Sequence, residues 1–260
     1  VVSKELELTL TGKSCGAEER APMCGVPYHA VEGYLNKLVA NGHKVAICEQ
    51  VEDPKLAKGL VKREVIRIVT PGTNTDMQAL DESKNNYIMC IVYLADKYGI
   101  SLADISTGDY FVTEVDTERK LIDEINKFAP SEIICNESFY MSGVDLSDMK
   151  NRLGIAVYSL EAWYFSDETA ENTLKDHFKV QSLEGLGLSD YACGTIAAGA
   201  LLRYLYETQK NDLGNLSAIH PYSTGKYMII DSSTRRNLEL VETLREKQKR
   251  GSLLWVLDKT

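Results

Sequence analysis

The order of hydrophobic runs after residue 86 constrains the fold of this chain more than any other feature of the sequence. Runs typical of β-strands lie at 87–94, 100–105 and 110–115. Two turn sequences, Lys97-Tyr98-Gly99 and Thr107-Gly108-Asp109, separate these runs. Because short turns of this kind join antiparallel neighbours, the sequence predicts a three-stranded antiparallel meander.

A helix and a fourth strand are predicted to follow the meander. The apolar residues of 118–128 recur on one side of a helix that ends before Pro130, and residues 131–135 are strand-like. Residues 189–209 form a further predicted helix, whose many alanines and glycines would let neighbouring elements approach closely. The order βββαβ followed by more helix is typical of an RNase H-like module.

Residues 1–72 predict a smaller α/β domain. An apolar stripe over 31–39 indicates a helix that ends at Asn41-Gly42. The segments 44–48 and 64–69 are strand-like and rich in Val and Ile. Glu52-Asp53 before Pro54 predicts a short helix that begins at Pro54, since proline suits the first helical position.

Two further segments complete the predicted organisation. Residues 73–86 are polar and weakly patterned, as expected of a linker. In the last segment, residues 213–260, a short strand or extended stretch is expected at 226–230. Asp231 is then predicted to cap a helix that carries Leu238 and Leu244 and ends in the basic run 245–250.

Five uncommon sequence motifs follow one another along the chain, each occurring once. They are Pro22-Met23-Cys24-Gly25-Val26-Pro27-Tyr28-His29-Ala30, Val45-Ala46-Ile47-Cys48-Glu49-Gln50-Val51-Glu52-Asp53-Pro54, Val69-Thr70-Pro71-Gly72-Thr73, Asp104-Ile105-Ser106-Thr107-Gly108 and Asp231-Ser232-Ser233-Thr234-Arg235-Arg236-Asn237-Leu238-Glu239. Together these motifs closely resemble the MutS family of DNA mismatch-repair proteins, and the resemblance spans nearly the whole chain.

The resemblance implies an α/β fold in three parts: a mismatch-recognition domain over 1–72, an RNase H-like connector domain over 87–212 and the start of an all-α core, or lever, domain over 213–260. In this family the complete protein is a homodimer that binds mismatched or looped double-stranded DNA. It couples binding to ATP and Mg in a distant ATPase domain and recruits MutL through the connector.

The family's Phe-x-Glu mismatch reader and its ATPase sequence do not occur in these 260 residues. We therefore expect the chain to be an internal piece of a longer protein. As such a piece it is expected to have no enzymatic activity and to bind no cofactor of its own.

The charge of the chain is unevenly distributed. The net charge is −9, made up of +1 over residues 1–72, −13 over 73–190 and +3 over 191–260. DNA phosphates are therefore expected to meet the first segment, where four basic residues lie close together around Glu64. They are Lys58, Lys62, Arg63 and Arg67.

The resemblance assigns DNA contacts to five residues. Arg63 matches a DNA-contacting arginine of the family, with Lys58 and Lys62 as weaker matches, and Lys13 lies in a loop where the family places a basic residue. Met23 resembles a residue that leans on the minor groove beside the mismatch, where an apolar side chain stabilises a kinked step. Without the resemblance, the basic residues could equally be solvated surface cations, and Met23 could be an ordinary core methionine.

Composition bounds the location and the metal chemistry. No apolar run approaches the length of a membrane span, and the first residues are not a signal peptide, so we expect a cytoplasmic chain without a membrane partner. The six cysteines contain no C-x-x-C pair and are expected to be buried thiols, with no metal site.

Two other functions fit the sequence. Asp104 and Asp109 flank a turn at a strand end, as metal-binding carboxylates do in RNase H-like nucleases, and Glu132 could add a third carboxylate. Turn or cap roles for the two aspartates are the plainer interpretation. The acidic middle segment could instead belong to a pure protein-interaction module.

Overall fold

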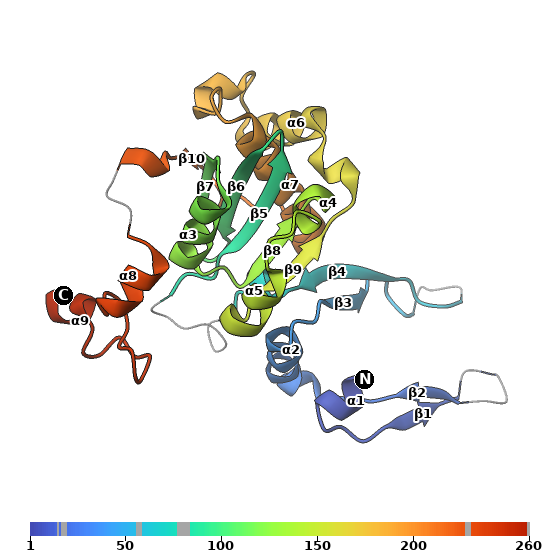
Figure 1. Ribbon diagram of the computed structural model, residues 1–260. Helices are drawn as coiled ribbons and strands as arrows, with labels where there is room; N and C mark the ends of the chain where they lie inside the picture. The colour runs from blue at the N-terminus through green and yellow to red at the C-terminus, as the bar shows by residue number, and fades with distance from the viewer. Residues whose placement is uncertain (15, 17–19, 56–58, 77–83, 227–229, 259–260) are drawn as a thin grey trace.

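The computed structural model describes residues 1–14, 16, 20–55, 59–76, 84–226 and 230–258. Its largest part is a six-stranded sheet with helices on both faces (Figure 1). The strand order is β10-β7-β6-β5-β8-β9. The strands are β5 (Ile88–Leu94), β6 (Lys97–Asp104), β7 (Asp109–Val115), β8 (Glu132–Cys135), β9 (Ala156–Ser159) and β10 (His220–Pro221).

The predicted meander is confirmed. β5, β6 and β7 pair antiparallel, whereas β8 is parallel to β5, β9 is parallel to β8 and β10 is parallel to β7. The mixed α/β fold class is confirmed with it.

Successive residues of β5 enter two different cores. Ile88, Cys90 and Val92 pack with α6 (Asp167–Phe178) and α7 (Ala192–Gln209) on one face of the sheet. Met89 and Ile91 pack on the other face with α3 (Glu118–Phe128), α4 (Glu137–Tyr140) and α5 (Leu146–Leu153). Burial of both faces explains why the strand is a continuous apolar run.

Small residues set the distance between α7 and its neighbours. A Cβ atom on Gly99 of β6 would lie 2.2 Å from the backbone C and O atoms of Cys193, and one on Gly199 would lie 2.3 Å from Cα of Ala170. The role predicted for the small residues of this helix is therefore confirmed. The helix begins at Ala192 and not at 189, because Tyr191 has a non-helical backbone.

Within the first 70 residues, the described stretches form two separate antiparallel hairpins and one substantial helix. The elements are α1 (Val2–Glu5), β1 (Thr11–Lys13), β2 (Ala21–Met23), η1 (Tyr28–Ala30), α2 (Val31–Ala40), β3 (Val45–Gln50) and β4 (Arg63–Val69). Leu35 and Val39 of α2 form a small core with Val69, Val45 and Ile47.

Two sequence predictions for this part have different outcomes. The helix over 31–39 is confirmed, and it is followed by Gly42 with a positive φ of 81°. The short helix predicted to begin at Pro54 is wrong for Pro54 and Lys55, which form a turn. Asp53 closes this turn by accepting a hydrogen bond from the Lys55 backbone N–H (2.9 Å), an alternative to capping a helix.

The cysteines differ in exposure. Cys90, Cys135 and Cys193 are buried, as predicted. Cys24 is half-buried. Cys48 is exposed, because it alternates along β3 with Val45 and Ile47, which are the residues that pack against α2. Cys15 lies outside the described residues.

The polar segment after β4 is packed at both of its ends. It begins with η2 (Pro71–Thr73), and Thr73, Asn74 and Asn86 are buried. The Asn86 side-chain amide donates to the carbonyls of Pro71 and Asn74, both at 3.0 Å. These ends therefore differ from a solvated linker, while 77–83 lie outside the described residues.

The last segment is less helical than predicted. It contains β10, which belongs to the six-stranded sheet, and then η5 (Thr224–Lys226), α8 (Ser232–Asn237) and α9 (Leu253–Leu257). Asp231 caps α8 as expected, accepting from the Thr234 backbone N–H at 2.7 Å. Of the stretch predicted at 226–230, Lys226 ends a 3-10 turn, and 227–229 lie outside the described residues.

The helix predicted through Leu238 and Leu244 to the basic run is wrong. α8 ends at Asn237, and turns and irregular backbone follow up to α9. Leu238 is 59% exposed and Leu244 49% exposed, so neither has a surface to pack against in the described part of the chain. A short helix without tertiary packing is marginal in water, which explains the difference. None of the described helices is long and apolar enough to cross a membrane.

Candidate nucleic-acid interface

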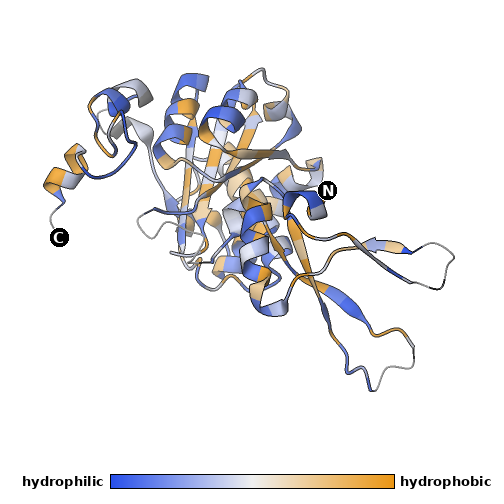
Figure 2. Cartoon of the chain, turned by 90° about the horizontal axis from the view of Figure 1, so that it is seen from below, coloured by the Kyte–Doolittle hydropathy of each residue, from blue (hydrophilic) through white to orange (hydrophobic). Residues whose placement is uncertain are grey.

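Two hairpins project from the body of the molecule on the same side. The β1–β2 and β3–β4 hairpins both extend away from the six-stranded sheet in Figure 1, and they point in a common direction again when the chain is seen from below (Figure 2). Each is a two-stranded antiparallel ribbon. Most residues of these four strands are exposed, so many of their side chains are available to a partner.

The β1–β2 hairpin carries Lys13 and Met23. Thr11 pairs with Met23 and Lys13 with Ala21, and the Thr11 hydroxyl donates to the Met23 carbonyl at 2.8 Å. The Lys13 side chain is exposed. Met23 is 44% exposed, so it is not the core methionine that the residues alone left open.

The β3–β4 hairpin carries Lys62 and Arg63. Arg63 is the exposed first residue of β4, opposite Gln50, and none of the ion pairs found among the described residues involves it. Lys62 is exposed but paired, with its Nζ 2.5 Å from Oε1 of Glu64. Lys58 lies outside the described residues.

Arg67 does not belong to the exposed basic cluster that the sequence suggested. Its guanidinium donates to the Thr73 carbonyl (3.2 Å) and to the Thr75 hydroxyl (3.1 Å), and its Nε is buried without a partner. The pairing of β3 with β4 shifts between Ile47 and Cys48, so Ile66 has no strand partner. This bulge interrupts the alternation that would align Arg67 with Arg63.

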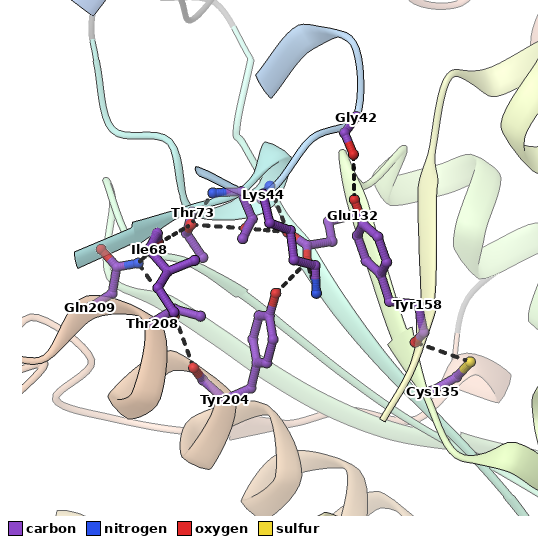
Figure 3. Close-up of polar contacts among 12 residues, drawn as sticks. Gly42, Lys44, Ile68, Thr73, Glu132, Cys135, Tyr158, Tyr204, Thr208 and Gln209 are labelled. Atoms are coloured by element: carbon purple, nitrogen blue, oxygen red, sulfur yellow. Dashed lines mark hydrogen bonds and ion pairs between the residues drawn. The ribbon is translucent and has the colours of Figure 1, made fainter. Parts of the chain in front are cut away.

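The root of the β3–β4 hairpin meets the large sheet through a polar cluster around a buried carboxylate (Figure 3). Glu132, the first residue of β8, is fully buried. One carboxylate oxygen accepts from the Thr70 hydroxyl and from the Gly72 backbone N–H (3.0 Å). The other accepts from the Tyr204 hydroxyl (2.7 Å) and lies 3.9 Å from Nζ of Lys44. We call this cluster, Lys44, Thr70, Gly72, Glu132 and Tyr204, the seam.

Lys44 is held by aromatic rings as well as by charge. Its Nζ lies 3.7 Å from the ring centroid of Tyr158 and 5.0 Å from that of Tyr204. Burial lowers the pKa of Lys44, and the Glu132 carboxylate opposes that shift. Burial, reinforced by Glu132, raises the pKa of Tyr158 to about 12. The Tyr158 hydroxyl is therefore a donor at neutral pH, and it donates to the Gly42 carbonyl at 2.7 Å.

A groove of ≈ 810 Å³ lies beside the seam. α2 lines it with Asn36 and Lys37, and the region of α5 and β9 lines it with Lys150 and Tyr158. Asn36 is engaged in hydrogen bonds, accepting from Asn74 (3.0 Å) and donating to Asp76 (2.6 Å). The groove therefore belongs to the junction between the first part of the chain and the large sheet.

The carboxylates considered for a nuclease have other partners. One oxygen of Asp104 accepts from the Ser106 backbone N–H (2.8 Å) and hydroxyl (2.6 Å), and the other accepts from the Asn86 backbone N–H (2.9 Å). This confirms its predicted turn role. Asp109 accepts from Asn85 and Tyr87, and among the described residues no three His, Cys, Asp or Glu side chains converge as a metal site.

Sequence reasoning missed the seam. It considered Glu132 only as a metal ligand and gave no role to Lys44 or Tyr204. One signal was present, because Thr70-Pro71-Gly72-Thr73 follows a strand directly and offers hydroxyl and backbone donors in a tight turn. The acceptor for those donors lies 60 residues or more further along the chain, beyond the reach of local patterns.

Comparison with known proteins places the two parts of the chain in one family. The family model described as MutS domain II matches residues 86–217, and the one described as MutS domain I matches residues 1–78. A DNA mismatch repair protein MutS of Lachnoclostridium phytofermentans is 67% identical over 260 residues, which is 100% of this chain and 28% of that protein.

Two further relatives have the same description. The DNA mismatch repair protein MutS of Acetivibrio thermocellus is 51% identical and that of Ruminiclostridium cellulolyticum is 50% identical, each over 263 residues. Each alignment covers 100% of this chain and 30% of the relative. The chain therefore spans less than a third of the length of the relatives that it matches.

Proposed function

The chain belongs to the MutS family of DNA mismatch repair proteins, and we propose that its two projecting hairpins contact the backbone and minor groove of mismatched duplex DNA. The observation that carries this proposal is their common direction, with exposed Lys13, Met23, Lys62 and Arg63 on them. Exposed cations on two neighbouring ribbons fit the spaced phosphates of a duplex.

The proposed roles differ between residues. Arg63 neutralises a phosphate, whereas Lys62 contributes less because Glu64 already pairs with it. Lys13 lies close enough to the duplex to contact a second phosphate. Met23 enters the minor groove as an apolar side chain that stabilises a kinked step. The role of Lys58 rests on the family resemblance alone.

We further propose the domain organisation expected from the sequence, namely recognition domain 1–72, linker 73–86, connector 87–212 and core domain from 213. Coupling to ATP and Mg, recruitment of MutL through the connector and homodimerisation are proposed for the longer protein, as in its family. The cytoplasm is the proposed location. For this chain itself we propose DNA contact without catalysis.

A DNA titration tests the proposal. Fluorescence anisotropy with a G·T duplex and its matched control, at two salt concentrations, should give weak binding that falls with salt at a log–log slope of about −2 to −3, as expected for two or three phosphate contacts. The sequence holds no Phe-x-Glu, so the two duplexes should bind alike. A clear preference for the mismatch, or binding that ignores salt, would contradict the proposal.

The same mixtures separate the alternatives. With Mg²⁺ or Mn²⁺ added, the DNA should stay intact, and cleavage abolished by Asp104→Asn would favour the nuclease. Binding that is unchanged by Arg63→Glu combined with Lys58→Glu would favour the pure protein-interaction module.

A further inference from the structure

We propose that Glu132 is a positioning residue, whose buried carboxylate fixes the β3–β4 hairpin at one orientation relative to the six-stranded sheet. The inference rests on the proposed function, because it concerns the orientation of a hairpin that is proposed to contact DNA. It assigns to the seam a role that is distinct from any contact with the nucleic acid.

The contacts of Glu132 come from both sides of the junction. Thr70 and Gly72 follow β4, and Lys44 precedes β3, whereas Glu132 and Tyr204 belong to β8 and α7 of the large sheet and its helical layer. A fully buried carboxylate is costly without donors, so these contacts must be kept together. Separation of the two parts at the seam would leave Glu132 short of partners.

Residues of the seam adjoin both strands of the hairpin at its root. Val45 pairs with Val69, and these two residues directly follow Lys44 and precede Thr70. β4 has seven residues, and strands rise about 3.3 Å per residue, so its far end lies roughly 20 Å from the root. A rotation of about 15° at the root would therefore displace Arg63 by on the order of 5 Å.

Close packing leaves little room for such a rotation. A Cβ atom on Gly72 would lie 2.7 Å from Cβ of Ile88 and 3.0 Å from Cβ of Glu132. The backbone of η2 thus lies directly against the first residues of β5 and β8. The hydrogen bond from the Gly72 N–H to Glu132 depends on this approach.

Spin-label distance measurements on the 260-residue chain without DNA test the inference. One label is attached to exposed Cys48 on β3, and the other to Glu168→Cys, an exposed position on α6. Cys15 and Cys24 are changed to serine, while Cys90, Cys135 and Cys193 are buried and protected from labelling. The unaltered seam should give one narrow distance distribution.

Glu132→Gln should widen or shift the Cys48–Glu168→Cys distance distribution by about 3 Å, because the amide cannot accept from all four donors and Cys48 lies about 10–13 Å from the root of the hairpin. Glu137→Gln, at an exposed glutamate that begins α4, is the matched control and should leave the distribution unchanged. Thr70→Val removes one donor at nearly constant side-chain shape and should widen the distance distribution. Thr70→Ser keeps the hydroxyl, so its distribution should stay as narrow as that of the unaltered chain.

The width of the distance distribution in these variants shows whether Glu132 fixes the orientation of the hairpin. If Glu132→Gln fails to fold, Thr70→Val against Thr70→Ser decides alone. Folded variants that all keep the narrow distribution would overturn the inference. A widened distribution with undiminished DNA binding would support the positioning role but contradict the proposed DNA contact of this hairpin, so the two failures are distinguishable.

Discussion

Arg63 and Arg67 lie four residues apart on one strand, yet their surroundings differ. Arg63 is exposed, whereas Arg67 donates to Thr73 and Thr75 from a half-buried position. Arg63→Gln should reduce the salt slope of DNA binding by about 0.9 and leave the free energy of unfolding unchanged. Arg67→Gln should do the reverse, lowering that free energy by about 1–2 kcal/mol.

Anisotropy titrations and urea unfolding of both arginine variants provide the measurements. Each variant serves as the control for the other, because the residue type and the strand are the same. Equal effects of the two substitutions on the salt slope would show that the assignment of Arg63 alone to a phosphate is wrong.

At this scale the sequence could predict exposed cations but not their partners. Clustering of basic residues at 58–67 was visible, but the bulge at Ile66 that turns Arg67 inward depends on strand pairing. The ion pair of Lys62 with Glu64 likewise depends on the rotamers of two side chains. The partners of the buried Glu132 carboxylate range along the chain from Lys44 to Tyr204, and no local pattern connects them.

At the scale of elements, α7 and β6 approach so closely that one methyl group should disturb them. Gly99→Ala would place Cβ against the backbone of Cys193, which is not the end of a flexible side chain. We expect a loss of about 1–3 kcal/mol in the free energy of unfolding, the usual effect of overpacking a core. Gly185→Ala has no atom within 4 Å of its Cβ and should change little.

Urea unfolding followed by circular dichroism measures both glycine variants. If Gly99→Ala were as stable as Gly185→Ala, the close contact between α7 and β6 would not be a constraint on this fold.

Elements that bury a periodic face could be predicted from the sequence, and elements without a packing partner could not. The strands of the meander and α3 carry strong patterns and lie in the two cores of the sheet. The stretch 238–250 carries the same kind of apolar spacing, but Leu238 and Leu244 are exposed and the backbone is not helical. Periodicity indicates which face would be buried, whereas burial itself supplies the stabilisation.

At the scale of the whole molecule, buried tyrosines should make the fold sensitive to alkali. Burial is the main cause that raises the pKa of eight of them, and neighbouring carboxylates add to it at Tyr87, Tyr158, Tyr204 and Tyr222. The pKa of Tyr87 and of Tyr158 rises to about 12, and those of Tyr204 and Tyr222 rise well above the usual value. Glu132 acts on Tyr204, and Glu124 acts on Tyr222 through a hydrogen bond of 2.5 Å.

Whether stability rises or falls with pH depends on which state, folded or unfolded, loses the tyrosine protons first. Below about pH 10 these tyrosines are protonated in both states, so their contribution to stability is fully present. As the pH rises from 10 towards 12, the unfolded chain ionises first and the free energy of unfolding falls. The pKa of Lys44 is lowered, so this group acts in the opposite direction below its unfolded pKa, but it is one group against eight tyrosines.

Because Tyr87 and Tyr158 are partly exposed, we expect a total loss of only about 1–3 kcal/mol between roughly pH 8.5 and 11, which lowers the urea midpoint by about 0.5–1.5 M. Tyr222→Phe should reduce this loss, whereas Tyr28→Phe, at a position that is 88% exposed, should not. Urea unfolding at the two pH values, with tyrosinate absorbance recorded in parallel, measures both effects. A constant midpoint, or native tyrosines that all titrate near pH 10, would mean that the hydroxyls of the seam and of the α3 face are open to solvent, and the buried junction described for this molecule would then be wrong.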